Sequence, residues 1–137
     1  MVKTARGRVP YLDASTGERA EREVSAAKAL MSSYNYAGST WAGGSEALCT
    51  GLPRDEWGIG GYVVSDWSLY DYTDKNQAFY AGTDVNFTSA AVTGEMADAT
   101  SATAVLAMRQ AMHRYLYATA SSNAMNGRGP TVRVTYV

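Results

Sequence analysis

A short apolar run, Tyr62-Val63-Val64, limits the folds open to this chain more than any other feature. Aromatic and β-branched residues favour strands, and a strand without polar alternation is typical of a parallel sheet that is buried on both faces. A glycine-rich segment at 58–61 precedes the run, which stops at Ser65-Asp66-Trp67. Two further short runs, at residues 29–34 and 83–87, are predicted strands.

Helix-forming residues separate the predicted strands. Helical composition marks three segments: residues 18–28, 74–80 and 100–120. A further short helix, capped by Ser45, is expected to end or kink at Gly51 and Pro53. Strand and helix therefore alternate three times, which predicts an α/β fold built from βα units with a parallel sheet.

The chain of 137 residues has the length of a single domain. Residues 1–17 show no sustained hydrophobic period and are expected to be an N-terminal tail or linker, so that the domain spans residues 18–122. Residues 123–137 are expected to be a C-terminal tail in which 131–137 alternate like an edge strand. Residues 89–98 are small and polar and are predicted to be a loop.

The longest predicted helix has a clear apolar stripe, which we expect to face the core. Its members are Val105, Met108, Met112, Tyr115 and Leu116. Arg109 and His113 flank the stripe on a more polar side, and Cys49 is expected to fill another helix face as a small apolar residue.

Charge and composition exclude several classes of function. Twelve Lys and Arg residues oppose 13 Asp and Glu residues, a balance that argues against a nucleic-acid or membrane-surface footprint. One cysteine and one histidine argue against a disulfide framework and against a Cys- or His-based metal site, and we expect neither a metal nor a cofactor. No apolar stretch is long enough for a membrane span, and the cellular compartment stays open.

Asp66 and Trp67 are the residues best placed to carry chemistry. Side chains just beyond the carboxyl end of a parallel strand line the active sites of α/β folds, and Asp66 follows such a strand directly. The indole of Trp67 offers a flat apolar surface on which a sugar ring can stack. The alternative is that Asp66 caps a turn while Trp67 packs in the core, and taken alone the residues favour that alternative.

A set of ordered segments extends beyond this pair. They are Met31-Ser32-Ser33-Tyr34-Asn35, Glu46-Ala47-Leu48, Arg54-Asp55-Glu56-Trp57-Gly58, Gly61-Tyr62-Val63-Val64-Ser65-Asp66-Trp67 and Ala81-Gly82-Thr83-Asp84. In their order and spacing these segments resemble glycoside hydrolase family 3, which contains β-glucosidases and related exo-acting enzymes. The resemblance covers about residues 21–87 and continues more weakly to Ser122-Asn123-Ala124-Met125-Asn126-Gly127.

The resemblance implies a fold, an activity and four site residues. The fold would be the last three βα units of a (β/α)8 barrel, and the parent activity would be retaining exo-hydrolysis of β-glycosides. Asp66 matches the catalytic nucleophile, and Tyr34 matches a tyrosine that hydrogen-bonds it. Met31 lies at a position lining the same subsite, and Trp67 matches an aromatic wall of the sugar site.

A retaining glycosidase also needs a second carboxyl group about 5–5.5 Å from the nucleophile. The resemblance supplies no such residue. Glu46, Asp74 and Glu95 are nominal candidates, but for each a solvated surface role is the stronger interpretation. The Lys-His pair and the sugar-binding Asp and Arg of the family's earlier strands have no counterpart here.

Partners follow from the same interpretation. A carbohydrate is the expected substrate, and no nucleic acid or membrane partner is expected. Three parallel strands would leave two open edges, so terminal segments, a second copy of the chain or a missing barrel fragment should cover them. The rival hypotheses are a non-catalytic fragment or relic that acts in binding or assembly, and a helical interaction protein in which 62–64 and 85–87 would be helical.

Overall fold

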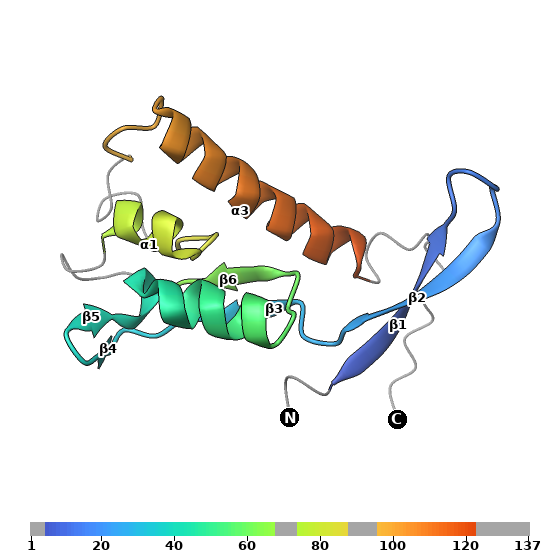
Figure 1. The fold of residues 1–137 in the computed structure, drawn as a ribbon, viewed down its shortest axis with the longest axis horizontal. Helices are drawn as coiled ribbons and strands as arrows, with labels where there is room; N and C mark the ends of the chain where they lie inside the picture. The colour runs from blue at the N-terminus through green and yellow to red at the C-terminus, as the bar shows by residue number, and fades with distance from the viewer. Residues whose placement is uncertain (1–4, 68–73, 88–95, 123–137) are drawn as a thin grey trace, which may run out of the picture.

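The computed structural model describes residues 5–67, 74–87 and 96–122. Its centre is a parallel pair of strands, β3 (Ala29–Met31) and β6 (Tyr62–Val64), in the register Ala29↔Tyr62, Leu30↔Val63 and Met31↔Val64. Both strands were predicted from the sequence, and both are confirmed (Figure 1). The hypothesis of a helical interaction protein, in which residues 62–64 would be helical, is therefore wrong for these residues.

The third predicted strand, at 83–87, is reduced to a single parallel bridge between Val85 and Val64. The N–H groups of Asp84 and Val85 both donate to the carbonyl of Val63, at 2.8 and 3.2 Å, and the N–H of Ser65 donates to the carbonyl of Val85 at 2.8 Å. This segment therefore runs beside β6 without forming a regular ladder.

Two antiparallel pairs depart from the all-parallel prediction. The short strands β4 (Tyr36–Ala37) and β5 (Thr40–Trp41) form one hairpin, which leads into the short helix η1 (Ala42–Gly44). The other is a longer hairpin of β1 (Arg6–Leu12) and β2 (Arg19–Ser25), which projects from one end of the molecule (Figure 1). The fold is thus α/β with mixed pairing.

The hairpin corrects the expectation of a helix over 18–28, and its first strand lies within residues 1–17, where a tail or linker was expected. The helical prediction is wrong because the turn before it is strongly specified. The carboxylate of Asp13 accepts hydrogen bonds from the N–H and hydroxyl of Ser15, at 2.8 and 2.6 Å, and Gly17 adopts a φ of 70°. Such turn chemistry closes a hairpin and overrides the modest helix propensity of the residues after it.

The helix near Ser45 is confirmed, but its details differ from the prediction. η2 (Ala47–Glu56) has no side-chain cap, and it continues through Gly51 and Pro53 as a wide π-helix. Proline lacks an N–H and crowds the carbonyl four residues earlier, so a wider turn accommodates it inside a helix. At the end of η2 the N–H of Trp57 donates to the carbonyl of Leu52 at 3.1 Å.

The two remaining helices confirm the prediction closely. α1 (Lys75–Ala81) is capped by Asp74, whose carboxylate accepts the N–H groups of Asn76 and Gln77. α3 (Ala102–Ala120) is capped by Ser101, whose hydroxyl accepts the N–H of Ala104 at 3.2 Å. Helix α3 contacts both β6 and α1.

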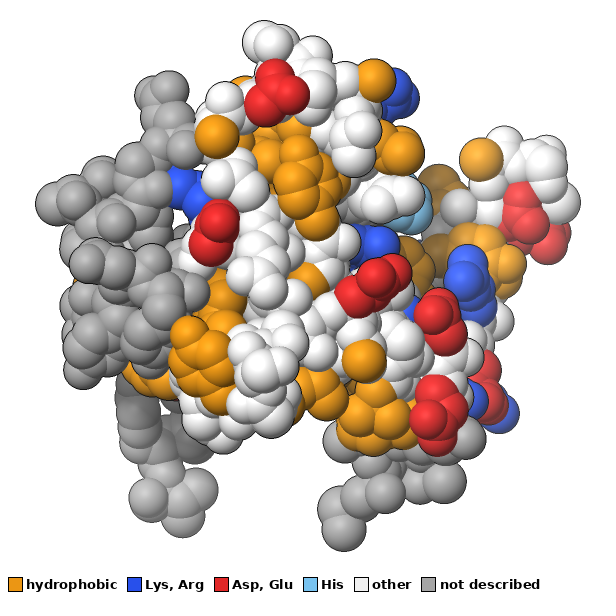
Figure 2. Space-filling model, turned by 60° about the vertical axis from the view of Figure 1, so that its left-hand side comes forward, with side chains coloured by type: hydrophobic (Ala, Val, Ile, Leu, Met, Phe, Trp, Pro, Cys, Tyr) orange, Lys and Arg blue, Asp and Glu red, His pale blue; other side chains and the backbone are white. Residues whose placement is uncertain are grey.

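The predicted core face of α3 is wrong. The helix buries small residues instead: Ala104, Ala111 and Ala118. Most of the predicted stripe is exposed, and Met112 and Leu116 each retain 56% of their accessible surface. Tyr115 is the member of the stripe that still packs on the sheet, with its ring centroid 5.3 Å from that of Tyr62 in β6. Figure 2 shows hydrophobic side chains interrupting the polar surface in several places.

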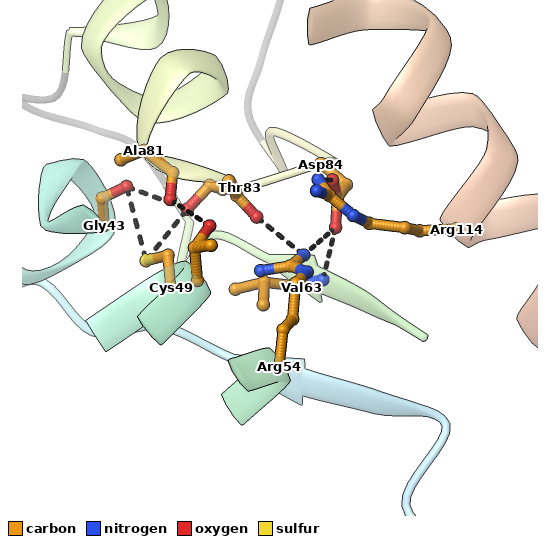
Figure 3. Close-up of polar contacts among 10 residues, drawn as sticks. Gly43, Cys49, Arg54, Val63, Ala81, Thr83, Asp84 and Arg114 are labelled. Atoms are coloured by element: carbon orange, nitrogen blue, oxygen red, sulfur yellow. Dashed lines mark hydrogen bonds and ion pairs between the residues drawn. The ribbon is translucent and has the colours of Figure 1, made fainter. Parts of the chain in front are cut away.

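A buried ionic cluster joins α3, η2 and β6 (Figure 3). The side chain of Asp84 is 1% exposed and forms ion pairs with Arg54 Nη2 at 2.5 Å and Arg114 Nη1 at 2.9 Å. Its Oδ2 also accepts the N–H of Val63 at 2.9 Å. Burial lowers the pKa of the Arg54 guanidinium, and the carboxylate of Asp84 opposes that shift. Because the cluster joins three elements, it holds β6 against both helices.

A second set of buried polar contacts fixes the segment between α1 and the bridge. The hydroxyl of Thr83 donates to the carbonyl of Gly43 at 2.8 Å, and the hydroxyl of Thr50 donates to the carbonyl of Ala81 at 2.8 Å (Figure 3). The thiol of Cys49 donates to the carbonyl of Ala42 at 3.3 Å. Cys49 is therefore a buried residue on a helix face, as predicted, with its thiol hydrogen-bonded.

Candidate active site

Three chain segments end at one edge of the central pair. The N–H of Ser32, just after β3, donates to the carbonyl of Val64 at 2.8 Å. The N–H of Ser65, just after β6, donates to the carbonyl of Val85 at 2.8 Å. The segments that begin at Ser32, at Ser65 and after Val85 therefore leave the strands next to one another. Carboxyl ends of parallel strands are where α/β proteins build their sites.

Asp66 lies two residues beyond the end of β6 and is partly exposed. Its Oδ1 accepts the backbone N–H of Trp67 at 2.7 Å. The turn-capping alternative raised from the sequence is thus part of the local structure. The residue stays partly exposed, so this hydrogen bond does not preclude a second role for Asp66.

Trp67 is 41% exposed, so the alternative in which it packs in the core is wrong. Its indole lies against the ring of Phe87, with ring centroids 4.9 Å apart and planes inclined at 78°. Phe87 itself is 55% exposed. This partner was missed from the sequence, although an aromatic residue at the end of the third predicted strand is a signal that could have found it.

Tyr34 and Met31 follow or end β3 at the same edge. The hydroxyl oxygen of Tyr34 is buried. Residues of β5 and η1 hold the backbone on either side of Tyr34. Trp41 Nε1 donates to the carbonyl oxygen of Ser33 at 3.0 Å, and the N–H of Ala42 donates to the carbonyl oxygen of Asn35 at 3.0 Å. This anchoring fixes the segment that carries Tyr34.

Met31 is exposed and lines a cavity of about 280 Å³ between β3 and η2. The other apolar walls of this cavity come from Leu30, Leu48, Leu52, Trp57 and Val63. Asp66 and Trp67 do not line it. Met31 therefore borders an apolar space beneath the strand as well as the edge where Asp66 lies.

The candidates for a second carboxyl group have other positions. Asp74 is the N-cap of α1, and its Oδ1 is occupied by the N–H groups there. Glu46 lines a different cavity of about 310 Å³, with Thr50, Gln110 and Arg114 among its walls. Glu95 lies outside the described residues, as do the predicted edge strand at 131–137 and most of the predicted loop at 89–98.

Residues 5–67, 74–87 and 96–122 contain no group of three or more His, Cys, Asp or Glu side chains that could hold a metal ion. Among the same residues, no helix has the length and apolar character needed to cross a membrane.

Comparison with known proteins identifies relatives of part of the chain. No family model matches. A probable β-glucosidase L from Aspergillus fumigatus is 37% identical over 72 residues, covering 45% of this chain and 10% of the relative. A β-glucosidase from Ruminococcus albus is 31% identical over 68 residues, covering 42% and 7%. One from Rhizobium radiobacter is 48% identical over 40 residues, covering 29% and 5%.

Solved structures share the fold. An exo-1,3/1,4-β-glucanase from a Pseudoalteromonas species aligns over 69% of this chain and 17% of its own, with a TM-score of 0.57 and 23% identity. β-Glucosidase 3B from Thermotoga neapolitana aligns over 74% of this chain and 16% of its own, with a TM-score of 0.59 and 21% identity.

The chain thus spans a tenth or less of the length of these curated relatives. Within that span, the resemblance inferred from the sequence is confirmed as a partial match to β-glucosidases.

Proposed function

We propose that this chain is a segment of a retaining β-glucosidase-type catalytic barrel and that Asp66 is the nucleophile. The observation that carries the proposal is the position of Asp66, a partly exposed residue just beyond β6, at the edge where β3 and the Val85 bridge also end. The partial identity with three β-glucosidases supports it.

The reaction has two steps. One oxygen of Asp66 attacks the anomeric carbon of a β-glycoside and forms a glycosyl ester, while the glycosidic C–O bond breaks and the leaving oxygen takes a proton from a carboxylic acid. Water then attacks the same carbon, gives its proton to that second carboxylate and releases Asp66. Two inversions retain the β configuration.

The proton donor belongs, in this proposal, to a part of the catalytic unit other than the described residues. Asp74 is committed to the α1 cap, and Glu46 lines the cavity beside α3. The same part would cover the exposed apolar face of α3. Tyr34, three residues after β3, would orient the Asp66 carboxylate, and Met31 and Trp67 would line the sugar site.

A second candidate function is a non-catalytic module that acts through assembly. The exposed stripe of α3 favours it, because Met112, Tyr115 and Leu116 form a contiguous apolar surface on one helix. The two candidates differ in a single measurable property, which is turnover of a glycoside.

The decisive experiment measures hydrolysis of p-nitrophenyl β-glucoside by the complete reading frame that contains this chain. Asp66→Asn should lower kcat at least about a thousandfold, because the covalent intermediate can no longer form. In Asp66→Gly, added azide should restore release of p-nitrophenol and yield the α-glucosyl azide. Asp74→Asn is the matched control, since it alters a helix cap and should leave kcat within about twofold.

Two results would contradict the nucleophile assignment. Turnover by Asp66→Asn close to that of the unmodified protein would exclude Asp66 from the chemistry. Absence of turnover by the unmodified protein, across aryl β-glycosides and at high protein concentration, would favour the assembly module.

A further inference from the structure

Trp67 and Phe87 form an exposed aromatic pair at the edge where Asp66 lies. Their ring centroids are 4.9 Å apart, and the planes meet at 78°. Both rings remain substantially accessible. Two large rings at nearly a right angle form an apolar corner, and clustered exposed aromatics at such an edge are far more informative than single ones.

The backbone fixes this corner relative to the Asp66 carboxylate. The N–H of Phe87 donates to Ser65 Oγ at 2.8 Å, and Ser65 is almost completely buried. The N–H of Trp67 donates to Asp66 Oδ1 at 2.7 Å. Residues 65–67 and Phe87 are thus connected by two hydrogen bonds and one ring contact, which place the backbone that carries both rings next to Asp66.

Resting on the function proposed above, we propose that Phe87 is a specificity-determining residue that holds Trp67 edge-to-face and completes an apolar corner for the C–H face of a β-glucosyl ring. Edge-to-face packing restricts the indole without hiding it, which suits a surface that must be both ordered and available to a ligand. Phe87 takes no part in bond making.

The geometry points to pyranosides whose hydroxyls are all equatorial. In a β-glucosyl ring the axial positions carry only hydrogens, so both faces are apolar. A galactosyl ring places the C4 hydroxyl axially, where it interrupts one face and would lose its hydration against an aromatic ring. The corner should therefore favour cellobiose over lactose, which differ only in the configuration at C4 of the non-reducing sugar.

The first measurement needs no sugar. In ¹H–¹⁵N spectra of the chain, the indole N–H signal of Trp67 is assigned with Trp67→Phe. It should shift in Phe87→Ala and Phe87→Leu, since both remove the ring current of Phe87. Leu116→Ala is the matched control, because Leu116 is 56% exposed, close to the 55% of Phe87, and lies on α3. It should leave the signal in place.

The second measurement titrates cellobiose and lactose against the same variants in the complete reading frame, with Asp66→Asn present in every protein compared so that neither sugar is hydrolysed. Phe87→Ala should weaken cellobiose binding by about two- to tenfold, the range expected for one aromatic contact, with lactose binding changed less. The cellobiose affinity of Phe87→Leu should lie between those of Phe87→Ala and the protein with Phe87, because leucine keeps part of the apolar area. Leu116→Ala should bind both sugars as tightly as the protein with Leu116. Asp66→Asn should still bind cellobiose.

The outcomes separate the inference from the function on which it rests. If the protein with Phe87 binds cellobiose but Phe87→Ala binds it equally well, or the Trp67 signal does not move, the role of Phe87 is overturned while the Asp66 proposal stands. Equal losses for cellobiose and lactose would show a purely structural role and would also overturn it. If this protein binds no glucoside, the sugar role of Phe87 is overturned, while the turnover assay of Asp66 variants described above decides the proposed function separately.

Discussion

The carboxylate of Asp84 accepts the backbone N–H of Val63 at 2.9 Å, so a side chain beyond α1 anchors the middle residue of β6. The same carboxylate binds Arg54 and Arg114. One acidic group therefore determines how β6 meets η2 and α3, and Asp66 follows only three positions after Val63.

Asp84→Asn should lower the free energy of unfolding by about 3–5 kcal/mol, because it leaves two partly buried guanidinium groups without a counter-charge. Urea unfolding followed by circular dichroism measures the change. Glu23→Gln is the control: its pair with Arg6 spans 3.9 Å at the surface and should contribute less than about 1 kcal/mol. Equal effects of the two substitutions would contradict the central role of Asp84.

The inversion of the α3 faces gives a second prediction. Ala104 has no exposed surface, so Ala104→Leu should overpack the interface and cost about 1–3 kcal/mol of stability. Met112→Ser removes an exposed apolar side chain and should change stability by no more than about 0.5 kcal/mol. Thermal unfolding distinguishes this arrangement from the opposite one, in which Met112→Ser would be the damaging substitution.

Gly61 and Gly51 should respond to alanine in opposite directions. A Cβ at Gly61 would clash with the carbonyl oxygen of Lys28, so Gly61→Ala must displace the start of β3 from β6 and should cost about 3 kcal/mol or more. Gly51 lies within η2, where an added Cβ would be 4.0 Å from the carbonyl oxygen of Glu46 and would meet no clash. Gly51→Ala should therefore be neutral or stabilise by about 0.5–1 kcal/mol, since alanine loses less entropy in a helix. A stable Gly61→Ala variant would refute the close β3–β6 approach.

Cys49 predicts an alkaline limit to stability. Burial raises the pKa of its thiol above the ordinary value of 9.0. The folded chain then keeps the thiol proton to a higher pH than the unfolded chain. The stabilisation is complete below the ordinary pKa and is lost as pH rises through the raised one. Urea midpoints measured from neutral to alkaline pH should fall more steeply for the unmodified chain than for Cys49→Ala, and parallel curves would contradict this.

The central strands, α1 and α3 could be predicted from the sequence because each has a strong local signal. Val63 and Val64 favour a strand almost anywhere, and Asp74 and Ser101 are good helix caps. The face of α3 could not be predicted, because hydrophobicity alone ranks Met112 above Ala104. The tight packing that requires alanine depends on which element lies opposite.

The local positions of the candidate site residues were predictable in part, while their roles stay a prediction. Asp66 and Trp67 follow directly from the abrupt end of β6, whereas the pairing of Trp67 with Phe87 depends on a parallel bridge between distant segments. The Asp84 cluster was missed for a related reason. Arg54, Asp84 and Arg114 are ordinary charged residues in the sequence, and only the tertiary fold buries them together.

The β1–β2 hairpin has a consequence for the order of folding. Its partners lie within residues 6–25, so it can close over a short loop in about 1–10 μs. Pairing of Ala29 with Tyr62 must instead wait until the whole intervening stretch has collapsed, a slower search with a larger entropic barrier. Refolding should therefore show an early phase that is insensitive to substitutions in β6, followed by a later one that the Asp84 cluster controls.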